Sequence, residues 1–255
     1  MILPVSWITD AALFVFGAAV GSFLNVCIYR LPAGRSIVFP GSSCPHCSTS
    51  IRWFDNIPIL GFLLLRGRCR SCGGRISPRY PLVELLAGLV PVLVAHRFGL
   101  TPASAAYVVF IWALIAITFI DLDHQIIPDR ISIPGTILGL ILGATILPVG
   151  WMGSLLGAVL GGGLFYLIAV ASRGGMGGGD IKLIAMIGAF LGWQAVFLTI
   201  LISALAGSAV GIYMMAVRGK GRKHPIPYGP FLVMGAVVYL FYGPEIIGWY
   251  LGIRG

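Results

Sequence analysis

Long apolar blocks constrain this chain more than any other feature. Hydrophobic residues make up 58% of the 255 residues and charged residues only 10%, whereas soluble domains carry about 25% charged residues. Many of the blocks approach the roughly 20 residues that a helix needs to cross a bilayer. The sequence therefore excludes a water-soluble domain and predicts an all-α polytopic membrane protein.

Eight blocks are candidates for membrane-spanning helices. The sixth is too short to cross alone, and we expect it to continue through Gly192 and Trp193 beside the seventh. The predicted spans are Ile8 to Tyr29, Pro81 to Phe98, Pro102 to Ile120, Ile131 to Pro148, Gly150 to Ala171, Ile181 to Leu191, Gln194 to Val217 and Pro230 to Leu251.

The basic residues predict the orientation, because Lys and Arg are retained on the cytoplasmic side during insertion. With eight spans and an outer amino terminus, all of the 17 Lys and Arg residues except Arg97 and Arg254 fall on the cytoplasmic side. Both termini are then on the outer face. The first block lacks a basic region before it and an obvious cleavage site after it, so it is not a cleaved signal peptide. Topology and lipid head groups explain the net charge of +9, so we expect no nucleic-acid partner.

Two CxxC pairs lie in the only sizeable polar stretch, residues 30–80. The first pair is Cys44 and Cys47, the second is Cys69 and Cys72, and 21 residues separate them. Two such knuckles can place four thiolates around one tetrahedral zinc ion. The alternative is two redox dithiols or free cysteines, but a cytoplasmic location disfavours structural disulfides. The spacing favours a structural zinc site.

The stretch around the cysteines is rich in Arg and Gly, so we expect it to build little hydrophobic core. Bound metal would then supply the folding energy. His46 inside the first knuckle is an alternative ligand, and Cys27 in the first span is expected to be a small buried residue. The predicted division is a first transmembrane helix over 1–29, a zinc-ribbon-like insertion over 30–80 and a membrane core over 81–255.

Asp121 and Asp180 are the acidic residues with the greatest chemical interest. Each lies where an apolar block meets the cytoplasmic edge, and carboxylates at such positions are costly and usually functional. Two carboxyl groups brought together cannot both ionise cheaply, so one keeps a proton while the other can activate water. That pair can hydrolyse a peptide bond. The alternatives are that Asp180 caps a helix and that Asp121 pairs with an arginine.

Three other acidic residues are assigned by their positions. Asp123 lies on a different helix face from Asp121, so these two do not form the pair. Asp129 follows a proline and is expected to have a structural role at the start of the fourth span. Glu84, at the start of the second span, could extend to the interface, pair with Arg79 or contact a substrate.

Taken together, these motifs resemble the type IV prepilin leader peptidase family, a group of GxGD membrane aspartyl proteases. Any one motif is weak, but together they occur in the family's order over most of the chain. The matching stretches are Gly21-Ser-Phe-Leu-Asn25-Val, the two CxxC pairs, Ser77-Pro-Arg-Tyr-Pro-Leu-Val-Glu84, Asp121-Leu-Asp-His-Gln-Ile-Ile-Pro-Asp129, Gly177-Gly-Gly-Asp180-Ile-Lys182 and Pro227-Tyr-Gly-Pro230-Phe.

The resemblance implies that Asp121 and Asp180 are catalytic. The family cleaves the basic leader of prepilins or pseudopilins at the cytoplasmic side of the bacterial inner membrane, which makes the termini of this chain periplasmic. A type IV pilus and a type II secretion system are equally open. Members with the cysteine segment commonly also methylate the new amino terminus with S-adenosylmethionine, but the chain has no Rossmann-like glycine motif for it. The implied substrate contacts are Glu84, Gly177, Gly179, Lys182, Pro227, Gly229 and Pro230.

Two other functions are weighed against this one. A proton-coupled transporter could use Asp121 and Asp180 as a proton relay, although transporter sites usually lie near the midplane rather than at one edge. A non-enzymatic protein that holds pilin subunits would have no need of aspartate chemistry.

Overall fold

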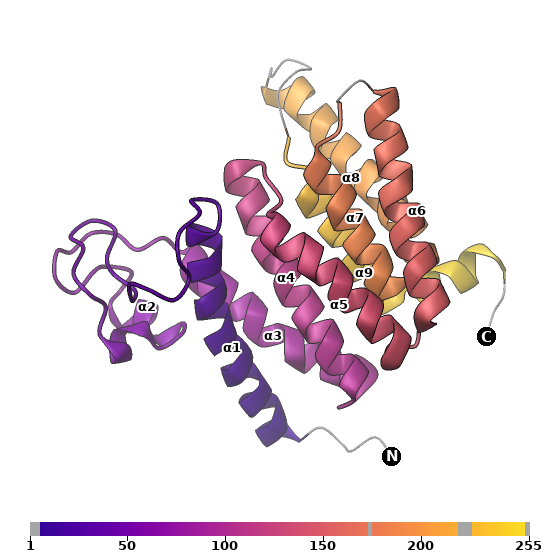
Figure 1. The fold of residues 1–255 in the computed structure, drawn as a ribbon. Coiled ribbons are helices and arrows are strands. Elements are labelled where there is room, and N and C mark those ends of the chain that lie inside the picture. The colour runs from indigo at the N-terminus through magenta and orange to yellow at the C-terminus, as the bar shows by residue number, and fades with distance from the viewer. Residues whose placement is uncertain (1–5, 173–174, 219–225, 253–255) are drawn as a thin grey trace. The chain divides into compact units, whose positions relative to one another are not determined.

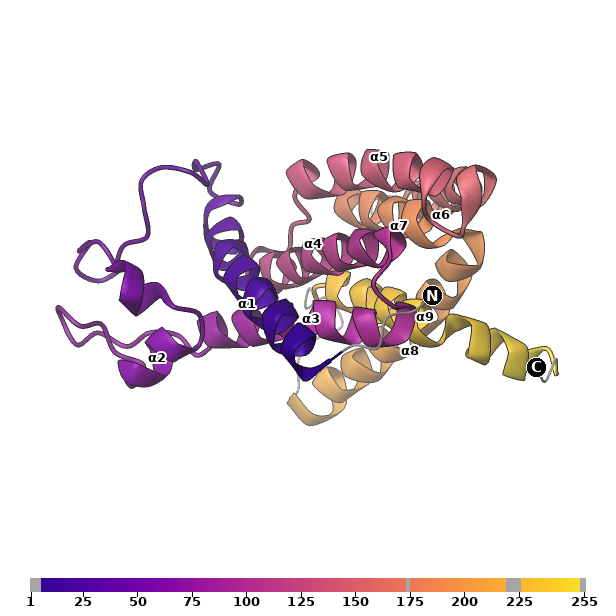
Figure 2. The same ribbon diagram turned by 90° about the horizontal axis from the view of Figure 1, so that it is seen from below.

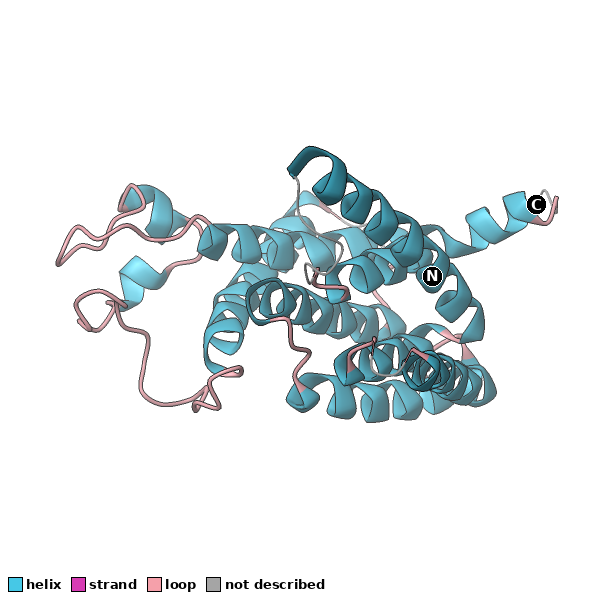
Figure 3. Cartoon of the chain, turned by 90° about the horizontal axis from the view of Figure 1, so that it is seen from above, coloured by secondary structure: helices cyan, strands magenta, loops and turns pink. Residues whose placement is uncertain are grey.

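The computed structural model describes residues 6–172, 175–218 and 226–252, and these ranges contain helices and no strand (Figure 3). Each predicted apolar block is a helix, which confirms the all-α membrane fold. Of the basic residues used for the orientation, Arg173, Lys220, Arg222, Lys223 and Arg254 lie outside the described residues. The long helices are α1 (Trp7–Arg30), α3 (Arg79–Phe98), α4 (Pro102–His124), α5 (Asp129–Thr145), α6 (Gly150–Ala171), α7 (Gly178–Leu191), α8 (Trp193–Arg218) and α9 (Gly229–Tyr250).

Within the described ranges, six of these helices are long and apolar enough to cross a membrane: α1, α3, α4, α6, α8 and α9. The other two are shorter, with 17 residues in α5 and 14 in α7. At the usual rise per residue they extend about 26 Å and about 21 Å, less than the roughly 30 Å of bilayer hydrocarbon.

The expected continuation of the sixth predicted span through Gly192 and Trp193 is wrong. Helix α7 ends at Leu191, and Gly192 has φ 87°, in the left-handed region that favours glycine. This glycine is the C-cap residue, and its N–H donates to the Gly188 carbonyl at 2.8 Å. Helix α8 then starts separately at Trp193.

Two short helices that the sequence analysis did not predict lie in the cysteine segment. They are the 3₁₀-helix η1 (Trp53–Asn56) and the five-residue helix α2 (Leu60–Leu64). The two pack together, because the backbone N–H of Gly61 donates to Ile57 O at 2.8 Å and a Cβ at Gly61 would collide with the Asp55 carbonyl.

Packing divides the chain into two compact units, Met1–Ala116 and Ile117–Gly255. In the first unit, α1 crosses α3 at close range (Figures 1 and 2). A Cβ at Gly21 of α1 would come within 2.6 Å of the Glu84 Cα on α3. The side chain of Asn25 donates a hydrogen bond to the Tyr80 carbonyl at 3.0 Å. These contacts align α1 and α3, which precede and follow the cysteine segment in the sequence.

Helix α7 is the centre of the second unit. It contacts α5, α6, α8 and α9, and Figure 1 shows it between neighbouring helices of this unit. Eight of its 14 residues are buried, including Ile184 and Ile187. The surrounding protein thus covers apolar residues that would otherwise face lipid.

Glycines set the distance between α6 and α7. A Cβ at Gly157 on α6 or at Gly188 on α7 would collide with the backbone of the other residue. Ser154 Oγ on α6 also donates to the Ala189 carbonyl at 2.6 Å. Such close backbone approach through small residues is typical of helix pairs in membranes. It fixes the position of α7, whose first turn carries Asp180.

We predict that Gly157→Ala destabilises the protein, because the added methyl group pushes against the α7 backbone. Overpacking of this kind costs about 1–3 kcal/mol. Gly163→Ala on the same helix is the matched control, since a Cβ there meets no atom within 4 Å and the change adds helix propensity. Thermal unfolding in detergent measures both; equal melting temperatures would contradict the prediction.

Candidate active site and zinc centre

Asp121 lies in the last turn of α4, and its side chain is held by the start of α9. The residue is only 4% exposed, and its Oδ2 accepts a hydrogen bond from the backbone N–H of Gly229 at 2.9 Å. Buried charges need such partners, and the amino terminus of a helix carries partial positive charge. Within the described residues the partner of Asp121 is therefore a helix terminus, whereas an arginine partner had been one alternative.

Glycine is required at position 229 for this contact. A Cβ there would lie 2.7 Å from the Asp121 Oδ2 atom. The preceding Tyr228 is fixed by a 2.8 Å hydrogen bond between its hydroxyl and that of Ser203 on α8. Pro230 follows in the first turn of α9, where its fixed φ suits a helix and its missing N–H costs nothing.

Asp180 occupies the third position of α7. The N-cap residue is Gly177, so the alternative in which Asp180 itself is the N-cap is wrong. The Asp180 side chain instead bonds to the backbone of Gly177, as the third helical residue does in a capping box. This bond holds the carboxyl group at the amino-terminal end of α7.

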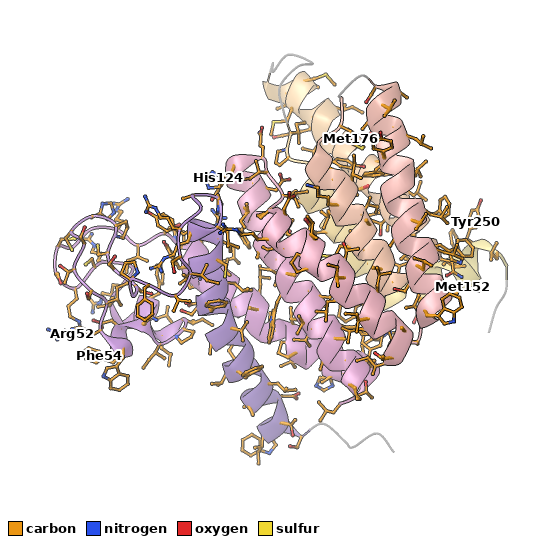
Figure 4. The ribbon with its side chains drawn as sticks, in the orientation of Figure 1. Arg52, Phe54, His124, Met152, Met176 and Tyr250 are labelled. Carbon is orange, nitrogen blue, oxygen red and sulfur yellow. The ribbon has the colours of Figure 1, made fainter. Side chains whose placement is uncertain are left out.

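The carboxyl group of Asp180 lies within electrostatic range of that of Asp121. Helix α7 also contacts α9, whose first residue binds Asp121. Figure 4 shows the same end of the second unit, where His124 ends α4 and Met176 precedes α7. A negative charge on one of these carboxyl groups therefore disfavours a negative charge on the other.

Gly179 and Lys182 of the Gly177–Lys182 motif contact the segment that follows α4 and the start of α5. A Cβ at Gly179 would come within 2.8 Å of the Ile127 Cβ, so the start of α7 packs tightly on the segment after Asp121. Lys182 Nζ lies 2.6 Å from Asp129 Oδ1, and both side chains are well exposed. An exposed ion pair contributes only about 0–1 kcal/mol.

Glu84 belongs to the first unit and makes a different contact. It is 8% exposed, and its Oε2 accepts a hydrogen bond from the backbone N–H of Ile59 at 2.7 Å. Ile59 directly precedes α2 and has φ 63°, a conformation that costs an isoleucine about 1–2 kcal/mol. The Glu84 carboxylate therefore holds part of the cysteine segment against α3.

The four cysteines of the two CxxC pairs converge on one point. Their Sγ atoms all lie within 4.8 Å of one another. Two of the separations are 3.9 Å, between Cys44 and Cys72, and 4.0 Å, between Cys47 and Cys69. A tetrahedral zinc ion with Zn–S bonds of about 2.3 Å needs sulfurs about 3.8 Å apart. The group fits zinc, and His46 is not part of it.

The two knuckles have the same backbone structure. In each, the N–H of the first cysteine donates to the carbonyl five residues later, at 3.0 Å for Cys44 and 2.8 Å for Cys69. In each, the residue four positions after that cysteine donates back to it and has positive φ: Ser48 at 57° and Gly73 at 69°. This repetition presents the four sulfurs as two equivalent pairs.

The groups around the sulfurs lower the pKa of some of the four cysteines and raise that of another. The Thr49 hydroxyl and backbone lower the pKa of Cys47 to about 6, and backbone hydrogen bonds from Cys72 and Ser71 lower the pKa of Cys69. The Gly74 backbone lowers the pKa of Cys72, but desolvation and the other sulfurs outweigh it and raise the value to about 11. Four adjacent thiolates therefore require a cation to offset their repulsion, and a zinc ion would supply that charge.

One ion pair in the cysteine segment was not predicted from the sequence. Arg70, inside the second CxxC pair, donates through Nε and Nη2 to the Asp55 carboxylate at 2.8 and 2.6 Å. The Arg70 guanidinium holds the pKa of Asp55 below its usual value. The signal was present, because Asp55 is the only acidic residue in the strongly basic stretch 30–80.

We predict that purified protein contains about one zinc ion per chain and that Cys44→Ser or Cys69→Ser removes most of it, because three thiolates bind zinc less tightly than four. Elemental analysis by mass spectrometry is the measurement. Cys27→Ala is the control, since Cys27 lies in α1 and outside the group. Metal-free wild-type protein would contradict the zinc assignment.

Comparison with known proteins identifies two family models in this chain. The Bacterial Peptidase A24 N-terminal domain matches residues 15–98, which hold the four cysteines, and the Type IV leader peptidase family matches residues 108–212, which hold Asp121 and Asp180.

Curated relatives match over nearly the whole length. A prepilin leader peptidase/N-methyltransferase of Aeromonas hydrophila is 36% identical over 96% of this chain and 94% of its own. Proteins of the same name from Stutzerimonas stutzeri and Pseudomonas aeruginosa are each 39% identical, over 93% and 94% of this chain and 92% and 93% of their own. No solved structure matches. The chain belongs to the type IV leader peptidase family.

Proposed function

We propose that this protein is a membrane endopeptidase that removes the basic leader of type IV prepilins or pseudopilins, with Asp121 and Asp180 as catalytic residues. The observation that supports the proposal is the electrostatic interaction between these two carboxyl groups, which are 59 positions apart in the sequence. The names of the curated relatives support the same activity.

The chemistry follows from one negative charge on two carboxyl groups. The ionised aspartate takes a proton from water as the water oxygen attacks the scissile carbonyl carbon. The protonated aspartate donates its proton to the carbonyl oxygen and so neutralises the developing charge. When the C–N bond breaks, the aspartate that took the proton from water gives it to the departing nitrogen, which leaves as the amine. The other aspartate takes back a proton from a hydroxyl of the tetrahedral intermediate, so both groups return to their starting states. No covalent intermediate with the protein is needed.

The helix termini stabilise the ionised form of either aspartate. Asp121 accepts the Gly229 N–H at the start of α9, and Asp180 bonds to Gly177 at the start of α7. Both helices direct their positive ends toward the pair. Movement of the single proton between the two groups during a catalytic cycle therefore leaves each one with a fixed hydrogen-bond partner.

The substrate would enter as an apolar helix in lipid, with its basic leader at the cytoplasmic face of the inner membrane. We assign its contacts to Gly177, Gly179, Lys182, Pro227, Gly229 and Pro230 around the aspartates. Anionic lipid would meet the leader's positive charge at the basic inner face. For Glu84 the contact with Ile59 favours a positioning role over a substrate contact.

The remaining assignments complete the proposal. The zinc segment over 30–80 lies on the cytoplasmic side between the first helix, 1–29, and the membrane core, 81–255, and both termini are periplasmic. Zinc has a structural role. The protein also methylates the new amino-terminal residue with S-adenosylmethionine. In support, the relatives are named N-methyltransferases.

We predict that Asp121→Asn and Asp180→Asn each lower the rate of leader removal at least about 10²-fold, because an amide can neither take nor give the proton. The assay incubates purified variant with a prepilin and follows the loss of the leader by mass spectrometry. Asp10→Asn in α1 is the control and should keep full activity. Full activity in either test variant would overturn the assignment, and a transporter or assembly role would then be favoured.

We also predict that Gly229→Ala lowers the cleavage rate about 10²-fold with little loss of folding, since displacing a catalytic group by about 1 Å has effects of this size. The new methyl group would occupy space now held by the Asp121 carboxylate. Gly207→Ala on α8 is the matched control, because its Cβ would meet Tyr228 only at an ordinary 3.5 Å. Equal rates for the two variants would contradict the role of the Gly229 contact.

A further inference from the structure

The cysteine segment carries an exposed apolar surface that neither zinc binding nor peptide cleavage explains. We call it the Trp53–Leu64 patch, and it consists of Trp53 from η1 and Leu60, Leu63 and Leu64 from α2. Trp53 is 80% exposed and Leu64 is 76% exposed. The three leucines have i, i+3 and i+4 spacing, so they share one face of α2. Figure 4 labels Phe54, whose ring lies 5.6 Å from that of Trp53.

The patch is held against a membrane-spanning helix. Ile59, the residue before α2, donates its N–H to Glu84 in the second turn of α3. Figure 1 accordingly shows α2 level with the middle turns of α1, and not beyond the carboxyl end of α1. Since α1 and α3 are both long and apolar enough to cross a bilayer, a bilayer that surrounds these two helices would also reach α2.

Packing and an ion pair also fix the position of the patch within the cysteine segment. Gly61 packs on the Asp55 carbonyl, with no room for a side chain between η1 and α2. Asp55 in turn binds Arg70 of the second zinc knuckle. The exposed side chains therefore belong to η1 and α2, whose position is fixed by the Glu84–Ile59 contact and by the Asp55–Arg70 ion pair.

Charge around the patch favours an anionic partner. Residues 30–80 contain eight arginines and a single acidic residue, Asp55, which Arg70 already neutralises. Arg52 and Arg66 lie at the two ends of the patch and are exposed. An apolar face with Trp and Leu, bordered by arginine, is typical of elements that lie in the interface of anionic membranes.

We propose that the Trp53–Leu64 patch is an interfacial membrane anchor, which inserts Trp53, Leu60, Leu63 and Leu64 at the boundary between head groups and acyl chains of an anionic bilayer. Arg52 and Arg66 contact lipid phosphates beside it. The anchor, together with the Glu84 contact, keeps the zinc segment at the membrane surface.

Photo-crosslinking in proteoliposomes of phosphatidylethanolamine and phosphatidylglycerol tests the proposal on the full-length protein. The residue p-benzoylphenylalanine is placed at Leu64, at Ser71 in the exposed second knuckle, and at Val15 on the exposed face of α1. We expect lipid adducts at Leu64 in a yield similar to Val15 and several-fold above Ser71. A yield at Leu64 as low as at Ser71 would overturn the proposal, as would adducts at Leu64 to a second copy of the chain or to another protein in place of lipid.

A second measurement tests the charge component. In the Leu64-labelled protein, the pair Arg52→Glu and Arg66→Glu should lower the adduct yield several-fold in bilayers with phosphatidylglycerol. Arg35→Glu combined with Arg75→Glu is the matched control, because both arginines are exposed in the same segment and outside the patch. An equal fall in yield for the control would show that net charge, and not the position of Arg52 and Arg66, governs the contact, and would overturn their assignment. Neither measurement depends on peptidase activity. The membrane-anchor proposal can therefore fail while the proposed function holds, and the proposed function can fail while the anchor holds.

Discussion

The hydrogen bond from the Gly229 N–H to the Asp121 carboxylate is the interaction on which the candidate site depends. It joins the end of α4 to the start of α9. It also gives a buried carboxyl group a partner that cannot move independently, because the donor is part of a helix backbone. Glycine alone permits this approach. With Asp121 fixed, the position of α7 decides whether Asp180 is within reach.

Helix α7 is positioned by packing against its neighbours. It is also the shortest of the long helices that the structure describes. Its buried face and the Gly157–Gly188 contact hold it among four other helices, while Gly192 ends it after 14 residues. Most of the length of such a helix is covered by protein, while its first turn carries a polar residue. The electrostatic interaction between Asp180 and Asp121 thus depends on close packing by small residues.

Much of this architecture could be predicted from the sequence. Apolar blocks located all eight long helices, the CxxC spacing predicted the cysteine cluster that the structure contains, and the motif order predicted the family that the comparisons confirm. The helix break at Gly192 was missed because the apolar pattern continues through it. The short helices η1 and α2 were missed because 4 and 5 residues are too few to show the periodicity of a helix. The Glu84–Ile59 and Asp55–Arg70 contacts join residues 25 and 15 positions apart through an irregular loop, and no periodic pattern encodes such partners.

The link between Glu84 and Ile59 has an evolutionary consequence. Its donor is a peptide N–H, which nineteen of the twenty common amino acids would supply equally well. The side chain at position 59 can therefore change while the hydrogen bond to Glu84 is kept. Proline is the exception, since it lacks the hydrogen and its ring confines φ to negative values. Relatives of this chain should accordingly vary in side chain at this site yet avoid proline, and glycine would be the variant that adopts the observed φ of 63° with the least strain.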